Sequence, residues 1–177
     1  MPRVEVKVTL EEMIDALIYG ELNAVVHSNS ARFLSFNLLA DAIEFLGACI
    51  DDDHPFDATG RSGARVCKAL VELFTFDDRY KKNRDSIRDG LRNSMAHQMR
   101  PSKEIGFVTQ WDSPNAKLSH LRIDEGSGRL ILVRESLYDD IRKATYIMKH
   151  RLRKGGHTHK LDEPFRTMYK NVPLQDK

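Results

Sequence analysis

One stretch of this chain is apolar around most of a helical circumference, and it constrains the fold more than any other feature. Residues 31–50 carry Phe, Leu and Ile side chains on nearly every face of a helix. Such a helix is stable only when other elements cover it, so the pattern predicts the centre of a bundle. Asp41 and Glu44 are the exceptions in this stretch. They either form a solvated edge, or one of them faces an arginine of another helix and orients its guanidinium.

Apolar residues spaced three and four apart predict further helices around the central one. The first covers residues 10–22 and opens with a capping box of Thr9 and Glu12. The fold class is therefore mainly α, a bundle of four or five helices. The remaining helices are expected from about residue 64, over the residues up to Pro101, and from a cap of Ser136 and Asp139 to about residue 152.

A β insert is expected between the last two long helices. Alternating apolar residues predict strands at 105–111, 117–124 and 129–134, with a hairpin turn at 125–128. The same alternation at residues 3–8 predicts an N-terminal strand that pairs with the insert. The sequence thus predicts a small antiparallel sheet within about 105–134. This insert either shapes a groove beside the preceding helix or is a decorative hairpin.

Composition favours one soluble domain over the 177 residues, with a basic tail from about residue 153. The N-terminus alternates charge with Val, unlike a signal peptide, and no apolar run reaches the length of a membrane span. We expect Cys49 and Cys67 to be buried, reduced thiols, which is typical of a cytoplasmic protein. The net charge of +2 does not by itself indicate nucleic acid, so RNA binding would depend on local clusters.

Two segments contain residue types that bind metals. Residues 51–54 place three aspartates beside His54, and the tail carries His157 and His159. Consecutive acids at a helix end are more typical of a solvated terminus, because an oxygen-rich metal loop needs further spaced ligands. The two tail histidines lack acidic or Cys co-ligands. We therefore expect neither a metal site nor a cofactor.

The helix that ends near Pro101 carries three different stripes side by side. Residues four apart stack on one helix face, so a buried stripe, an arginine stripe and a polar stripe each run along this segment. The buried stripe fixes the helix, while the other two present guanidinium, amide and imidazole groups together. The stripes are Ile87, Leu91 and Met95; Arg84, Arg88 and Arg92; and Asp85, Asp89, Asn93 and His97.

Arg92, Asn93 and His97 form an Arg-Asn-x-x-x-His motif late in this helix. In this motif, and in the helices between about residues 10 and 152, the chain resembles the HEPN superfamily (higher eukaryotes and prokaryotes nucleotide-binding domains). Members are small helical bundles, many of them metal-independent ribonucleases in toxin, defence and RNA-processing systems. Others are non-catalytic partners of small nucleotidyltransferases. The resemblance also implies a homodimer that brings two such motifs together.

The motif suits RNA cleavage because RNA contains its own nucleophile, the ribose 2′-hydroxyl. His97 would move protons near neutral pH, Arg92 would hold the phosphate with its planar fork, and Asn93 would orient the imidazole or the substrate. The basic segment 76–84 lies beside the arginine stripe and suggests phosphate contacts. The expected RNA-binding residues are Lys81, Lys82, Arg84, Arg88 and Arg100.

The same residues allow three interpretations. The chain is either a HEPN-like endoribonuclease of a toxin or defence system, or a non-catalytic module that binds a nucleotide, a nucleic acid, a nucleotidyltransferase or an antitoxin. Taken without the family, an Arg and a His late in a helix also complement the helix dipole, which contributes only about 0.3–1 kcal/mol.

Overall fold

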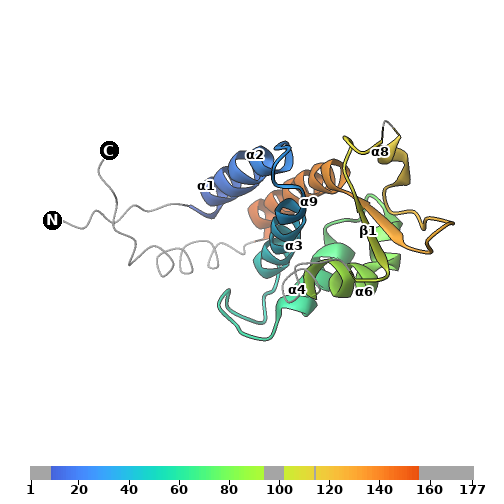
Figure 1. Ribbon diagram of the computed structural model, residues 1–177. Coiled ribbons are helices and arrows are strands. Elements are labelled where there is room, and N and C mark those ends of the chain that lie inside the picture. The colour runs from blue at the N-terminus through green and yellow to red at the C-terminus, as the bar shows by residue number, and fades with distance from the viewer. Residues whose placement is uncertain (1–8, 94–101, 114, 156–177) are drawn as a thin grey trace.

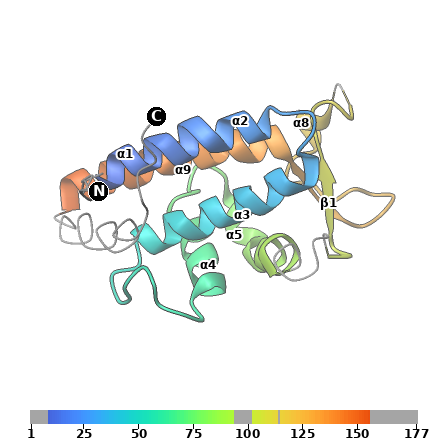
Figure 2. The ribbon, with the colours of Figure 1, turned by 60° about the vertical axis from the view of Figure 1, so that its left-hand side comes forward.

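The computed structural model describes residues 9–93, 102–113 and 115–155, and this part is mainly helical (Figure 1). Its centre is α3 (Arg32–Cys49), which buries Phe36, Leu39, Ile43 and Leu46. Figure 2 shows the first helix and α9 on one side of α3, and α4 on the other. The prediction of a central helix at 31–50 is therefore confirmed within one residue at each end.

The first helix is continuous but changes its width along its length. It comprises α1 (Leu10–Ile14), the π-helix η1 (Asp15–Leu22) and α2 (Asn23–Val26), and so extends four residues beyond the predicted end. The predicted capping box is present: the Glu12 amide donates to Thr9 Oγ1 at 3.1 Å, and the Thr9 amide donates to Glu12 Oε2 at 2.7 Å. These two bonds satisfy amides that a helix start leaves without partners.

The last helix, α9 (Arg134–Gly155), lies beside the first helix (Figure 2). The Tyr138 hydroxyl joins the two helices by donating to the Ile18 carbonyl at 3.0 Å. The helix begins two residues before the predicted cap, so Ser136 is buried in its first turn instead of capping it. Its predicted inward face is confirmed, since the following residues are all buried: Leu137, Ile141, Ala144, Met148 and Leu152.

Four elements lie on the other side of α3. They are α4 (Ser62–Glu72), α5 (Asp78–Lys82), α6 (Arg84–Ile87) and the π-helix η2 (Arg88–Asn93). Of these, α4 and η2 contact α3, and α5 and α6 contact α4. The α3 and α4 backbones approach closely at Gly47. A Cβ atom there would lie 2.0 Å from the Arg65 carbonyl oxygen, so only glycine fits.

The predicted antiparallel sheet is wrong. The structure has two strands, β1 (Ile105–Val108) and β2 (Leu130–Val133), and they run parallel, with Ile105 opposite Leu130. Much of the predicted middle strand is instead the short helix α8 (Ala116–Ser119) and the turn that follows it. The N-terminal strand predicted at residues 3–8 lies outside the described residues.

The order of the segments explains the parallel pairing. After α8 the chain returns along β2 on its outer edge, where the Leu121 amide donates to the Ile131 carbonyl at 2.8 Å. An isolated antiparallel bridge joins Ile123 to Leu130, and the predicted turn at 125–128 reverses the chain. β2 therefore lies between β1 and the segment 121–123. The chain reverses its direction twice between β1 and β2, so the two strands run parallel.

The two cysteines differ in how far they are buried. Cys49 is buried and Cys67 is partly exposed, so the expectation of a buried thiol is right only for Cys49. In the described ranges, no helix combines the length and the apolar character that crossing a bilayer requires.

Replacement of Gly47 by alanine tests the close approach of α3 and α4. The new methyl group would overlap the Arg65 backbone, so we expect Gly47→Ala to lower the free energy of unfolding by about 3 kcal/mol in urea denaturation. Gly20→Ala is the matched control, because a Cβ atom there would meet only the Asp15 carbonyl oxygen at 3.8 Å. Equal unfolding free energies for the two variants would contradict the packing described.

Candidate functional site

The helix that contains Arg92 and Asn93 is anchored by its buried side. Ile87 and Leu91 are buried as predicted, while Met95 lies outside the described residues. At Gly90 the helix meets β1 so closely that a Cβ atom would lie 2.6 Å from Ile105 Cγ1. The π-helical turns of η2 widen the helix from Arg88 to Asn93, a distortion often found at functional sites.

Arg92 points from η2 toward α3, where Glu44 receives it. The Arg92 Nε atom donates to Glu44 Oε2 at 2.5 Å, and the Ser62 hydroxyl of α4 donates to the same oxygen at 2.6 Å. The Arg92 and Glu44 side chains are only 20% and 24% exposed. Of the two interpretations of the acids on α3, the one that pairs an acid with this arginine is therefore confirmed.

Asp41 adds a second carboxylate to this cluster. Its Oδ1 atom lies 3.9 Å from Arg92 Nε. Burial raises the pKa of Asp41 above its ordinary value, the charge of Arg92 opposes this rise, and the charge of Glu44 adds to it. The Arg92 guanidinium therefore has two acidic neighbours. Glu44 accepts a hydrogen bond from it, and Asp41 lies farther away.

The predicted arginine stripe is largely neutralised by acids of the same helix. Arg88 donates to Asp85 at 2.8 Å and to both carboxylate oxygens of Asp89, and the hydrogen bonds to Asp89 are the main cause that raises the pKa of Arg88. Asn93 donates from Nδ2 to Asp89 Oδ1 at 3.1 Å. The Arg84 Nε atom lies 3.7 Å from Asp85 Oδ2. These side chains would have to exchange acid partners for phosphates before binding RNA.

The basic side chains of the segment 76–84 have two kinds of environment. Lys81 and Lys82 are exposed on α5. Arg79 instead donates to Asp77 at 2.6 Å and to the His120 carbonyl at 3.0 Å. The prediction that the basic segment 76–84 lies beside the arginine stripe therefore does not hold for the Arg79 side chain. The expected site residues His97 and Arg100 lie outside the described residues.

In the acidic stretch after α3, Asp52 and Asp53 are exposed, as expected of a solvated terminus, but Asp51 belongs to a buried ion-pair cluster. Asp51 is buried, and its two oxygens bind His54 Nδ1 at 3.1 Å and Arg65 Nε at 3.2 Å. Burial alone would raise the pKa of Asp51, but the hydrogen bonds and the charges of His54 and Arg65 together lower it. Asp51, Asp53 and His54 have ligand atoms within 4.8 Å of one another. A cation there would have to displace the Arg65 guanidinium from Asp51.

A second polar network, which the sequence did not indicate, joins α5, α9 and the segment after α8. The Val133 amide donates to His120 Nδ1 at 3.0 Å, so the proton of the neutral ring is on Nε2. His120 Nε2 then donates to the Tyr80 hydroxyl at 3.0 Å, and Tyr80 donates to Asp140 Oδ2 at 2.8 Å. All three side chains are buried, and burial is the main cause that raises the pKa of Tyr80.

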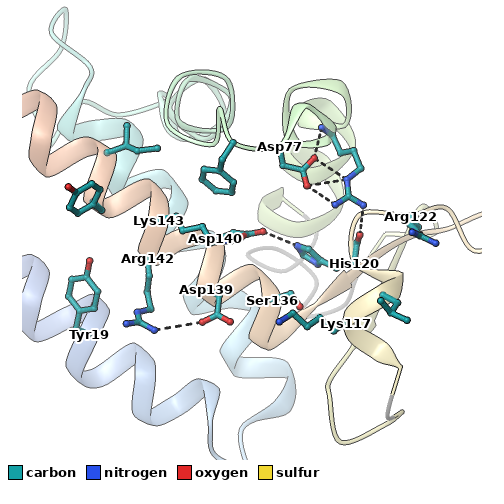
Figure 3. Close-up of a pocket in the computed structure, with 15 residues that line it drawn as sticks. Tyr19, Asp77, Lys117, His120, Arg122, Ser136, Asp139, Asp140, Arg142 and Lys143 are labelled. Atoms are coloured by element: carbon teal, nitrogen blue, oxygen red, sulfur yellow. Dashed lines mark hydrogen bonds and ion pairs between the residues drawn. The ribbon is translucent and has the colours of Figure 1, made fainter.

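Two members of this network, His120 and Asp140, line an open cavity of about 1050 Å³ (Figure 3). We call it the α9 hollow, because α9 supplies one wall from Ser136 to Ile147. The rest comes from η1, the start of α5, and the segment of α8 and His120. None of its lining residues belongs to α3, α4, α6 or η2, so it is separate from the Arg92 cluster.

Comparison with known families, curated proteins and solved structures finds no match for this chain. The HEPN resemblance therefore rests on the Arg92, Asn93 and His97 motif and on the helical architecture. The candidate site comprises the Arg92 cluster, and the α9 hollow is a second surface to explain.

Protonation of Asp140 should weaken the fold at low pH. Burial alone would raise its pKa, but the nearby His120 ring and the hydrogen bonds from Lys143 and Tyr80 lower it below the ordinary 3.8. A lowered pKa contributes stability that is present above 3.8 and is lost as the pH falls through the folded-state value. We expect Asp140→Asn to lower the free energy of unfolding by about 2 kcal/mol at pH 7, and the difference from wild type to shrink only as the pH falls below 3.8.

Asp139→Asn is the matched control, because Asp139 is the preceding residue of α9 and its side chain is half exposed. Its free energy of unfolding should stay within about 0.5 kcal/mol of wild type at pH 7. Urea denaturation from pH 7 to pH 3 measures both variants. A pH-independent deficit for Asp140→Asn would show that the carboxylate charge does not matter.

Proposed function

We propose that the chain is a HEPN-like, metal-independent endoribonuclease. The observation that carries the proposal is the placement of Arg92, which a carboxylate of another helix holds by a single nitrogen. In the described part of the chain, the contacts of Arg92 use Nε. The two terminal nitrogens Nη1 and Nη2 are then the atoms that would meet a phosphate, in the paired geometry that guanidinium groups adopt.

The proposed reaction uses groups of the RNA and of the helix, without a metal ion. His97 takes the proton of a ribose 2′-hydroxyl, and the 2′-oxygen attacks the adjacent phosphorus. The bond from phosphorus to the 5′-oxygen breaks, a proton reaches that oxygen, and the products are a 2′,3′-cyclic phosphate and a 5′-hydroxyl end. Arg92 stabilises the charge on the phosphate oxygens, and Asn93 orients His97 or the substrate.

A single His would have to act as base and then as acid, so we propose that the site is completed by a homodimer. Two motifs would place one His on each side of the scissile bond. Glu44 has a supporting role in each copy, because it fixes the direction of Arg92 through a bond of 2.5 Å. Lys81, Lys82, Arg84, Arg88 and Arg100 would bind the flanking phosphates.

The second candidate function is a non-catalytic module that binds RNA, a nucleotidyltransferase or an antitoxin. The pairing of Arg88 with Asp85 and Asp89 favours it, because cations that already have acid partners attract phosphates less strongly. Asn93 also donates to Asp89.

Cleavage of a labelled single-stranded RNA in excess EDTA tests the proposal. We expect wild type to leave 2′,3′-cyclic phosphate ends, and both Arg92→Ala and His97→Ala to lower the rate at least about 100-fold, because each removes a group that acts on the reacting atoms. Arg129→Ala and His150→Ala are the matched controls, since both residues are exposed and neither belongs to α3, α4 or η2.

The outcomes separate the two candidate functions. Cleavage that survives Arg92→Ala and His97→Ala unchanged would show that the activity is located elsewhere. Absence of cleavage in a folded wild-type protein, with RNA or a partner protein still bound, would favour the non-catalytic module. Melting temperatures measured on every variant separate a lost rate from a lost fold.

A further inference from the structure

The α9 hollow gathers charged and large apolar side chains that the proposed reaction does not use. Phe76, Leu118 and Tyr146 are large apolar or aromatic side chains that are exposed to solvent, and all three line it. Exposed apolar groups gathered in one concave place are typical of binding sites. The same hollow contains five cationic side chains and three carboxylates, which leaves an excess of two positive charges.

One end of the hollow is cationic. Lys117 and Arg122 lie there, from α8 and the segment after it (Figure 3). Both side chains are exposed, and within the described ranges neither forms an ion pair of 4.0 Å or less with an acid. They are the cations of the hollow best able to receive an external anion.

The other end combines aromatic rings with cations that the rings help to position. The Arg142 guanidinium lies 5.7 Å from the centre of the Tyr19 ring, and Lys143 Nζ lies 5.1 Å from that of Phe76. Tyr146 follows Arg142 by one helical turn on α9, and it is 72% exposed. A flat ring system can stack on Tyr146 without displacing any buried group.

Ser136 gives the hollow a polar group without a partner. It is more than nine-tenths buried, and no described residue accepts or donates a hydrogen bond at its Oγ atom. An unpaired buried hydroxyl is costly, so such groups usually serve a ligand or a bound water. Figure 3 places Ser136 between Asp139 and Lys117, near the middle of the hollow.

We propose that the α9 hollow binds a short segment of single-stranded RNA. One phosphate of the strand binds Lys117 and Arg122 at one end of the hollow, and the base of another nucleotide stacks on Tyr146 at the other end. The excess of two positive charges matches two backbone phosphates, and aromatic faces beside cations are the usual platform for single-stranded nucleic acid. This site needs no residue of the Arg92 cluster, so the inference does not depend on the proposed cleavage.

Fluorescence anisotropy with a labelled 2′-O-methyl oligoribonucleotide tests the site, because this probe cannot be cleaved through its 2′ position. We expect the double variant Lys117→Ala, Arg122→Ala to weaken binding at least about tenfold and to reduce the slope of log affinity against log salt by about 1.4. Tyr146→Ala should weaken binding about fivefold or more.

The controls remove the same groups outside the hollow. Lys103→Ala with Arg129→Ala removes one Lys and one Arg that are exposed elsewhere, and Ile123→Ala removes an exposed apolar side chain of the loop beyond the hollow. These variants should bind within about twofold of wild type. Equal weakening by the hollow and control variants would overturn the proposal, since it would indicate a diffuse charge effect.

Calorimetry with a nucleoside monophosphate and with inorganic phosphate tests whether the site requires a strand. We expect the oligonucleotide to bind much more tightly than either small probe, because only a strand contacts both ends of the hollow. Binding of the monophosphate as tightly as the oligonucleotide, binding of an oligoglutamate peptide alone, or binding of none of these probes would overturn the proposal.

Discussion

The carboxylate of Glu44 is the interaction on which the candidate site depends, because one oxygen atom joins three elements of the bundle. Glu44 belongs to α3, and its Oε2 accepts hydrogen bonds from Ser62 of α4 and from Arg92 of η2. Removal of either member would leave a partly buried charge without its partner, which usually costs more than the pair contributes. The direction of Arg92 is therefore fixed by the packing of α3 on α4 as well as by its own helix.

Most helices of the fold could be predicted from the sequence because their signals are local. The apolar circumference of α3 and the capping box of Thr9 with Glu12 each involve residues within one element. The β insert could not be predicted in the same way. Alternation identifies strand-forming residues, but the edge at which β2 meets β1 is decided by the path of the chain through α8. Gly47 likewise reveals the close approach to Arg65 only once both helices are placed.

The candidate site was predictable only in part, for a related reason. The Arg-Asn-x-x-x-His spacing identified Arg92, and the acids three residues before or one after Arg88 gave a local signal of its neutralisation. The pairing of Asp51 with Arg65 and the network of Tyr80, His120 and Asp140 link residues far apart in the chain. No periodicity in the sequence encodes such pairs, so only the assembled fold brings them together.

The central claim is that Glu44 positions Arg92 for work on a phosphate, and a double-mutant cycle of RNA cleavage tests it most directly. Rates would be measured for wild type, Glu44→Gln, Arg92→Ala and the double variant, with melting temperatures in parallel. We predict that Glu44→Gln lowers the rate in wild type but has little further effect once Arg92 is alanine, because the carboxylate acts through the guanidinium. Independent, additive losses, or a Glu44→Gln variant as active as wild type, would contradict the claim.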